Sequence, residues 1–329
     1  MAYLDIIVPH CKEPWTTGKK FFDMLSLQRG INFDDIRVIL AQDGEEGQLP
    51  YIKYLPYPFQ ITEKVIPHQG VSVARNAGLD ASSAEWVAFC DFDDMFSSVL
   101  SLKVALEALK KAQEGGKVYL WNRFMEEGRN AETGTYLLYK HAWDMTFIHG
   151  RFIRREFLID NGIRFNPALT FGEDAEFNAL CQIIAGEERI GEIREPIYLW
   201  CENKESVTRR EKDKSVFYGR MLEHRFSTAE ELQRRGIEKE YTGAVVRTVV
   251  DCYYEFTSDK SPENITKCEK QFAAWWKKHR AAFISAPAEM LGKIMSNVRE
   301  TAVKSGACVV ERVTLGDWLQ SIDEKYRTQ

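Results

Sequence analysis

The sequence lacks long apolar runs, paired-cysteine motifs and an excess of positive charge, and each absence argues against a class of protein. No apolar run approaches the ~18 residues of a membrane-spanning helix. Asp5 follows Leu4 directly, so the expected basic and apolar regions of a signal peptide are missing. The formal net charge of −5 argues against nucleic acid as a partner.

The seven cysteines are scattered and form no CxxC pair. An odd number of unpaired thiols is most simply explained by a reducing compartment. The cysteine pattern therefore predicts a cytoplasmic protein.

The first third of the chain alternates between strand and helix patterns. With 44% hydrophobic residues in 329, the chain can bury one large core or two smaller ones. Alternation of this kind predicts a parallel, Rossmann-like sheet with helices on its faces, whose ligands bind beyond the carboxyl ends of the strands. The predicted strands cover 4–8, 36–40, 60–66 and the run from 86, and the predicted helices cover 15–27 and 71–81.

The predicted central strand, 86–90, ends at three carboxylates. Because side chains at i and i+2 share a face of an extended chain, we expect Asp91 and Asp93 to point into one cleft. Two adjacent carboxylates repel each other unless a cation lies beside them. Their oxygen atoms are ligands that suit Mg²⁺ or Mn²⁺. The alternative is an acidic loop in which Asp94 or Ser97 caps the next helix.

Two other segments place polar groups at the same edge of the predicted sheet. Pro9 ends the first strand, and Asp43 follows the second, where its carboxylate can accept hydrogen bonds from a ribose or a base N–H. Arg75 lies early in a helix opened by Gly70, which favours phosphate binding, although the segment matches neither GxGxxG nor Walker A. The alternatives are a turn residue at Asp43 and a surface ion pair at Arg75.

These motifs, in this order, resemble those of a family 2 glycosyltransferase with the GT-A fold. The resemblance covers about residues 3 to 210 and implies a Rossmann-like, mostly parallel central sheet with flanking helices. The segments that carry it are Pro9, Asp43, 70–78 with Ala74-Arg75-Asn76, Asp91-Phe92-Asp93-Asp94 and 171–177 (Phe-Gly-Glu-Asp-Ala-Glu-Phe).

The resemblance implies a nucleotide-sugar donor, usually a UDP-sugar, and a divalent cofactor, Mn²⁺ or Mg²⁺. Pro9 and Asp43 would line the uracil pocket, with Arg75 near the nucleotide. Asp91 would meet the ribose or the water shell of the metal. Asp93 would be the metal ligand.

For catalysis, the resemblance implies that Asp174 is the base. Glu173 and Asp174 also begin an amphipathic helix, where acids are ordinary dipole partners. His149, Gly150, Glu173 and Trp200 would shape the donor or acceptor subsite, although a lone histidine is often simply packed.

Three departures from the family pattern stand out. Gln42 occupies a position where the family often has a second acid, and Cys201 stands where an arginine is common. No histidine in the segment after Asp174 corresponds to the one that completes the metal shell in some relatives. The segment 197–208 resembles the closing strand and flexible loop of the family.

From about residue 211 the pattern becomes helical. This predicts a glycosyltransferase domain over 1–210 and an α-helical region over 211–329, for which acceptor recognition and oligomerisation are the candidate roles. The segment 272–280 joins aromatic residues to a basic run, which fits either a core with a solvated face or attachment to a polymer or a membrane surface. The predicted helices cover 216–235, 239–256, 262–282, 287–304 and 317–326.

The sequence thus predicts an inverting, metal-dependent glycosyltransferase that acts on a glycan, a polymer or another hydroxyl-bearing acceptor. A nucleotidyltransferase and a nucleotide-sugar-binding protein without turnover are the alternatives. We expect loops such as 123–135 to determine which sugar is bound.

Overall fold

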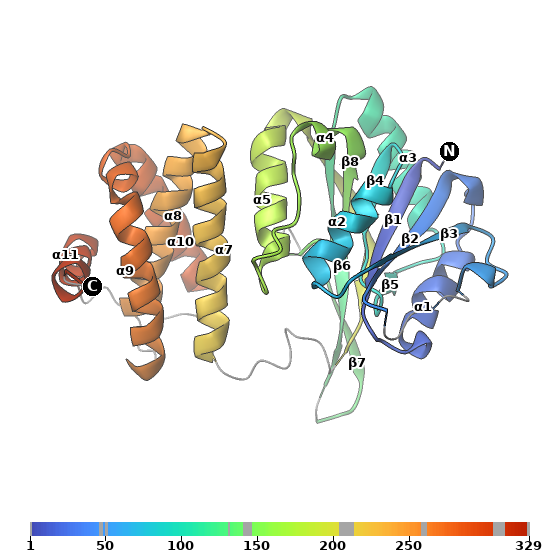
Figure 1. The fold of residues 1–329 in the computed structure, drawn as a ribbon, viewed down its shortest axis with the longest axis horizontal. Helices are drawn as coiled ribbons and strands as arrows, with labels where there is room; N and C mark the ends of the chain where they lie inside the picture. Colours follow the sequence, from blue (N-terminus) through green and yellow to red (C-terminus); the bar gives the residue numbers. More distant parts are fainter. Residues whose placement is uncertain are drawn as a thin grey trace. The chain divides into compact units, whose positions relative to one another are not determined.

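The computed structural model describes residues 2–45, 49, 52–130, 132–140, 147–203, 214–257, 262–304 and 313–327. The chain divides into two compact units, Met1–Arg209 and Arg210–Gln329. Figure 1 shows the strands and helices of each unit. The predicted segment 204–208 lies outside the described residues.

One half of the sheet in the first unit is entirely parallel. Strands β1 (Leu4–His10), β2 (Ile36–Asp43), β3 (Gln60–Ile66) and β4 (Trp86–Phe89) lie side by side in the order β3-β2-β1-β4. Both faces of β1 and β2 are almost completely buried, as expected for parallel strands covered by helices. The predicted strands are therefore confirmed, but β1 continues through Pro9 to His10 instead of ending at the proline.

The other half of the sheet is mixed. It continues from β4 in the order β8-β6-β9-β5, with β7 paired to β6. The pairs β4–β8, β8–β6, β6–β7 and β9–β5 are antiparallel, whereas β6 and β9 are parallel with an irregular register after Asn122. These strands are β5 (Met95–Phe96), β6 (Tyr119–Arg129), β7 (Tyr136–Lys140), β8 (Arg151–Arg154) and β9 (Ile190–Trp200).

The segment predicted as a loop over 123–135 is mostly a strand. Residues 123–129 continue β6 and pair with β7 and β9. Its polar sequence obscured a strand that forms a hairpin with β7 and also pairs in parallel with β9, which lies about 70 residues further along the chain. The loop prediction was therefore wrong.

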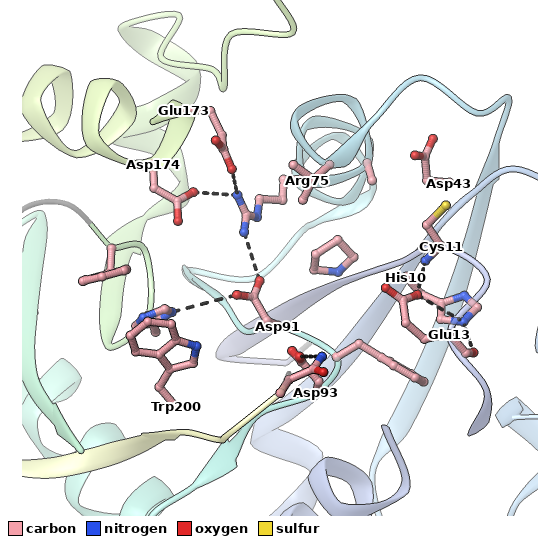
Figure 2. A pocket seen from close by; sticks show the side chains of 17 residues that line it. His10, Cys11, Glu13, Asp43, Arg75, Asp91, Asp93, Glu173, Asp174 and Trp200 are labelled. Carbon is pink, nitrogen blue, oxygen red and sulfur yellow. Dashed lines mark hydrogen bonds and ion pairs between the residues drawn. The ribbon is translucent and has the colours of Figure 1, made fainter. Parts of the chain in front are cut away.

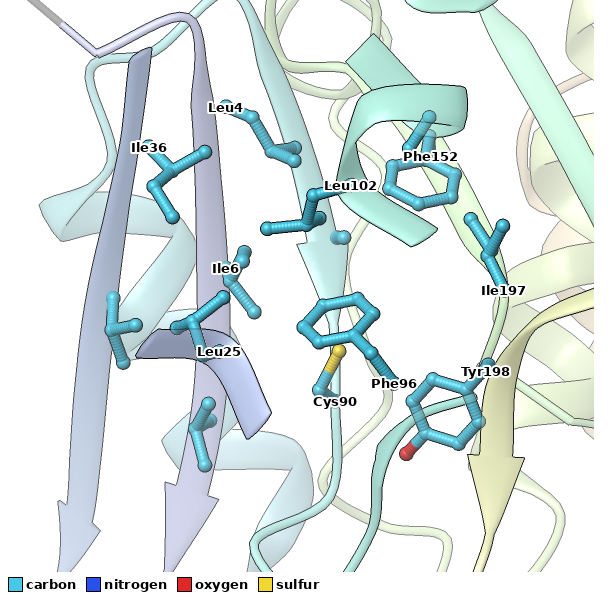
Figure 3. Packing of buried hydrophobic residues seen from close by; sticks show 14 of the residues in the cluster. Leu4, Ile6, Leu25, Ile36, Cys90, Phe96, Leu102, Phe152, Ile197 and Tyr198 are labelled. Carbon is cyan, nitrogen blue, oxygen red and sulfur yellow. The ribbon is translucent and has the colours of Figure 1, made fainter. Parts of the chain in front are cut away.

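Helices cover both faces of the sheet. Phe21, Phe22 and Leu25 of α1 (Trp15–Ser26) and Leu102 of α3 (Ser101–Glu114) belong to one buried core with Ile6 of β1. Figure 3 shows Leu25, Leu102 and Ile6 in this core. The opposite face carries α2 (Val71–Ala81) and α5 (Glu173–Ala185), and a Cβ placed on Gly78 of α2 would lie 2.4 Å from Ile7. A short helix α4 (Arg155–Asp160) and three 3₁₀ turns at Phe33–Asp35, Ile52–Tyr54 and Glu187–Arg189 complete the unit.

The described part of the second unit is helical, as predicted. Its aromatic residues Phe272, Trp275 and Trp276 are buried, so this part of the segment 272–280 belongs to the core. Among the described residues, no helix is both long and apolar enough to cross a membrane. The helices are α7 (Lys214–Arg234), α8 (Glu238–Thr257), α9 (Pro262–Ile284), α10 (Ala288–Lys304) and α11 (Leu315–Lys325).

Candidate active site

A pocket of about 340 Å³ lies at the carboxyl ends of the parallel strands in the first unit. Its walls come from β1, β2, the segment after β4, and the first turns of α2 and α5. This is the edge where ligands bind in open α/β sheets. The pocket is lined by nine of the ten predicted site residues: Pro9, Asp43, Arg75, Asp91, Asp93, His149, Glu173, Asp174 and Trp200.

A buried arginine stands between three carboxylates in this pocket (Figure 2). Arg75 donates through Nη1 to Asp174 Oδ1 at 2.6 Å and to Glu173 Oε1 at 3.0 Å, and through Nη2 to Asp91 Oδ1 at 2.9 Å. Burial acts to lower the pKa of Arg75, but the three carboxylates outweigh it and raise that pKa. The reading of Arg75 as a surface ion pair is therefore wrong, because its side chain is 4% exposed.

The carboxyl group of Asp174 has a raised pKa. Burial is the largest cause and raises its pKa to about 8; the negative charges of Glu173 and Asp91 act in the same direction. Arg75 and the backbone N–H of Ile148, 3.3 Å from Oδ2, act in the opposite direction. A carboxylate with such a pKa can accept a proton at physiological pH, as a general base must.

Asp91 and Asp93 both reach the pocket, but for a reason that differs from the predicted one. Strand β4 ends at Phe89, and the N–H of Asp94 bonds to the carbonyl of Asp91 at 3.2 Å, which closes a turn. The two acids therefore lie on a turn and not on one face of a strand. The Nδ2 group of Asn203 donates to Asp93 Oδ2 at 2.6 Å.

The pKa of Asp91 is lowered. Burial favours its neutral form, but the positive charge of Arg75 and the neighbouring His149 outweigh burial. His149 Nδ1 lies 4.0 Å from Asp91 Oδ2, and the imidazole stacks on Tyr198 with 5.0 Å between ring centroids. Asp91 is thus an anion at the centre of the site.

Asp94 fastens the end of β9 and caps no helix. The hydroxyl of Tyr198 donates to its Oδ2 at 2.6 Å, and the backbone N–H of Cys201 donates to its Oδ1 at 2.8 Å. Burial, followed by the charges of Asp91 and Asp93, raises the pKa of Asp94 well above its usual range. The reading of Asp94 or Ser97 as a cap is wrong, since α3 begins at Ser101 and its cap position is Leu100.

Two arrangements of ligands for a hard divalent cation can be compared. Oxygens of Asp91 and Asp94 and a nitrogen of His149 lie within 4.8 Å of one another. However, both oxygens of Asp94 already accept hydrogen bonds and its side chain is fully buried. Asp91 and Asp93 both line the pocket and offer oxygen atoms, so this pair fits Mg²⁺ or Mn²⁺ better.

Asp43 holds the loop that leads into α2. Its Oδ1 accepts the N–H of Gln69 at 2.7 Å, and its Oδ2 accepts the N–H of Gly70 at 2.9 Å. Each carboxylate oxygen has a second lone pair, so the group can accept a further donor. Asp43 is therefore a loop anchor as well as a wall of the pocket.

Gly150 is the one predicted site residue that does not line the pocket. It adopts φ +71°, and a Cβ added there would lie 3.2 Å from Cβ of Asn122. The glycine lets the chain pass close to β6 just before β8. Its place in a donor or acceptor subsite stays a prediction.

Eight further residues that were not among the predicted site residues line the pocket. Six of them lie within four residues of Pro9, Arg75 or Asp91 in the sequence, so position alone could have indicated them. The other two come from segments whose approach to the site depends on the folded chain. The eight are His10, Cys11, Glu13, Val71, Ala74, Phe92, Phe147 and Asn203.

Comparison with known proteins agrees with this geometry. Residues 5–168 match the family model described as "Glycosyl transferase family 2". The uncharacterized glycosyltransferase EpsJ of Bacillus subtilis (strain 168) is 27% identical over 196 residues, which cover 53% of this chain and 55% of EpsJ. The chain thus spans about half the length of this curated relative.

Solved structures share the fold. S. aureus TarS 1-349, in a structure with UDP-GlcNAc, has a TM-score of 0.63 and 14% identity, covering 92% of each chain. A longer S. aureus TarS structure has a TM-score of 0.61 and 16% identity, covering 88% of this chain and 50% of that one. The predicted GT-A fold is confirmed.

Proposed function

Because this chain belongs to glycosyltransferase family 2, we propose that it transfers a sugar from a nucleotide-sugar, a UDP-sugar, to an acceptor hydroxyl with inversion at the sugar. The observation that carries this proposal is the Asp174 carboxyl, whose pKa is raised to about 8 in the same pocket as Asp91 and Asp93. Inverting transfer needs a base for the acceptor hydroxyl and positive charge for the departing diphosphate. In this pocket, Asp174 can supply the base, and Arg75 together with a cation held by Asp91 and Asp93 can supply the positive charge.

Asp174 is the base in this proposal, and Arg75 orients it. The 2.6 Å contact fixes Oδ1, while Oδ2 faces the backbone N–H of Ile148 at a longer 3.3 Å. As Asp174 takes up the acceptor proton, its charge is neutralised, and Arg75 remains paired with Asp91 and Glu173. The arginine therefore never loses all its partners during the proton transfer.

Asp91 and Asp93 are the residues that would hold Mg²⁺ or Mn²⁺. When bound, such an ion neutralises charge on a diphosphate leaving group. Asn203 orients Asp93 through its 2.6 Å hydrogen bond, which leaves the other carboxylate oxygen of Asp93 for a ligand.

A uridine donor is supported by the opposite end of the pocket. Asp43 retains lone pairs for a base N–H, and Pro9 lines the same wall. The TarS structure with UDP-GlcNAc, which shares the fold, supports the same choice. For the unit Arg210–Gln329, acceptor recognition and oligomerisation remain the proposed roles.

A nucleotidyltransferase would use the acids and the metal but would leave Asp174 without a task. A binding protein without turnover would not need a carboxyl poised near neutral pH. Release of free UDP from a UDP-sugar by the purified chain would exclude the latter.

Calorimetric binding of UDP, GDP, CDP and TDP, with Mn²⁺ and again with EDTA, tests the donor site. We expect UDP-selective, metal-dependent binding, and we expect Asp93→Asn to weaken it at least tenfold in Mn²⁺. The matched control is Asp160→Asn on α4, which does not line the pocket and should bind like the wild type. Equal binding in metal and in chelator would overturn the metal assignment.

A further inference from the structure

Three different donor atoms meet beside the nucleobase end of the pocket. Sγ of Cys11, Nδ1 of His68 and a carboxylate oxygen of Asp43 lie within 4.8 Å of one another. The Sγ–Nδ1 distance is 3.6 Å, and Nδ1 lies 3.0 Å from Oδ2 of Asp43. Figure 2 shows Cys11 and Asp43 together at this end, away from Arg75 and Asp174.

The backbone holds these residues in place. Asp43 is the last residue of β2, and Cys11 follows the last residue of β1, so the parallel pairing of the two strands brings them to one edge. His68 lies in the loop after β3 that Asp43 fastens through the N–H groups of Gln69 and Gly70. The cluster is therefore built by the sheet and by one anchored loop.

The distances are close to those between ligands of one tetrahedral zinc ion. With Zn–S about 2.3 Å and Zn–N or Zn–O about 2.1 Å, tetrahedral angles place sulfur about 3.6 Å from nitrogen, and nitrogen about 3.4 Å from oxygen. The observed sulfur–nitrogen separation is 3.6 Å. The observed nitrogen–oxygen separation is 3.0 Å, so the exposed His68 side chain has to move slightly away from Asp43 to admit the ion. We propose that Cys11, His68 and Asp43 form a Zn²⁺ site at the nucleobase end of the pocket.

The two ends of the pocket then select different ions. Asp91 and Asp93 offer oxygen alone, which suits Mg²⁺ or Mn²⁺, whereas thiolate and imidazole ligands favour Zn²⁺. If the proposed function holds, Zn²⁺ engages the Asp43 carboxylate that would accept the base N–H. Zinc therefore competes with the donor nucleotide, while Mn²⁺ supports it.

Cobalt spectroscopy tests the site directly, because a thiolate bound to tetrahedral Co²⁺ gives a charge-transfer band. The other described cysteines, at 90, 181, 201, 252 and 268, are buried, and Cys308 lies outside the described residues. The full chain, reduced and metal-free, is titrated with Co²⁺ as wild type, Cys11→Ser, His68→Ala and the control Cys308→Ser.

We expect one equivalent of Co²⁺ to produce the band in wild type and in Cys308→Ser. Cys11→Ser should lose the band, and His68→Ala should need at least tenfold more Co²⁺. Since His68 is 63% exposed at its side chain, its replacement leaves the fold intact. Absence of the band in wild type, or its persistence in Cys11→Ser, would show that His68 and Asp43 form an ordinary hydrogen-bonded pair.

The competition is tested separately by UDP binding in Mn²⁺ with and without one equivalent of Zn²⁺. Zinc should weaken UDP binding at least tenfold in wild type but not in Cys11→Ser, which also corrects for zinc chelated by UDP itself. Unchanged UDP affinity in wild type would overturn the competition. If UDP does not bind at all, the donor proposal fails, and the cobalt band alone decides the zinc site.

Discussion

Replacement of Asp174 by asparagine tests the central chemical claim. Asparagine matches the shape of the protonated carboxyl but cannot accept a proton from an acceptor hydroxyl. Loss of a positioned base typically lowers the rate ~10² to 10⁴-fold. We expect a loss in this range for transfer, measured as UDP release with a donor found by screening, and UDP binding within about twofold of wild type.

The pH profile gives an independent readout. With a pKa of about 8, Asp174 is about one-tenth deprotonated at pH 7, so the wild-type kcat/KM should rise about tenfold for each pH unit up to about pH 8. Asp174→Asn should lose that inflection. Glu173→Gln, which removes a neighbouring charge from the same arginine, should keep the inflection but move it to lower pH, because Glu173 raises the pKa of Asp174.

Urea unfolding of Asp174→Asn, compared with the wild type, shows whether this variant still folds. The folded pKa of Asp174 lies above the unfolded value of about 3.9, so the folded state binds more protons between about pH 4 and pH 8. The contribution of Asp174 to stability therefore falls as pH rises through this window. Asp174→Asn should gain stability relative to wild type as pH rises, measured by urea unfolding. A variant that unfolds in urea like the wild type but fails to bind UDP would refute the base assignment.

Two further substitutions test the ion pairs of Arg75 and the packing of Gly18 against Phe92. Arg75→Met leaves three carboxylates without their cation and should lower the free energy of unfolding by about 3–5 kcal/mol at pH 8 in urea titrations. That loss should shrink at lower pH, where protonation neutralises the acids; a loss independent of pH would contradict the ion-pair account. Gly18→Ala places a Cβ 2.2 Å from the ring of Phe92. Because Phe92 lies between Asp91 and Asp93, the proposed metal ligands, this change should reduce both Tm and metal-dependent UDP binding. The helical control Gly292→Ala meets no atom within 4 Å and should leave both unchanged or raise Tm slightly, so equal effects of the two alanines would exclude the steric explanation.

Much of the fold was predictable because local patterns and final structure agree. The strand over 60–66 and the helix over 71–81 have the predicted bounds. Buried parallel strands are apolar throughout and helices repeat every three to four residues, so both leave a signal within a few residues. The mixed half left no such signal, because its pairing joins β4 to β8 and β6 to β9 across long stretches of chain.

The site was predictable as a set of residues but not as a network of contacts. Arg75 meets acids 98 and 99 residues away, and Asp94 meets Tyr198 104 residues away. Asp94 in particular has the sequence of a metal-binding acid or a cap, yet burial and two hydrogen bonds make it a structural group. Sequence spacing carries no information on which carboxylate of a run faces inward after the strand has ended.

The two backbone hydrogen bonds that Asp43 accepts limit how this enzyme could be re-engineered. Asparagine at this position would offer an NH₂ group to one of the two backbone N–H donors, at Gln69 or Gly70, and would loosen the start of α2. A change of base preference is therefore better sought at Cys11, which lines the same end of the pocket and is only partly buried, although its replacement removes a proposed zinc ligand. His10 also lines this end, but it is buried against Phe92, so a directed-evolution library should restrict this position to residues that keep that packing.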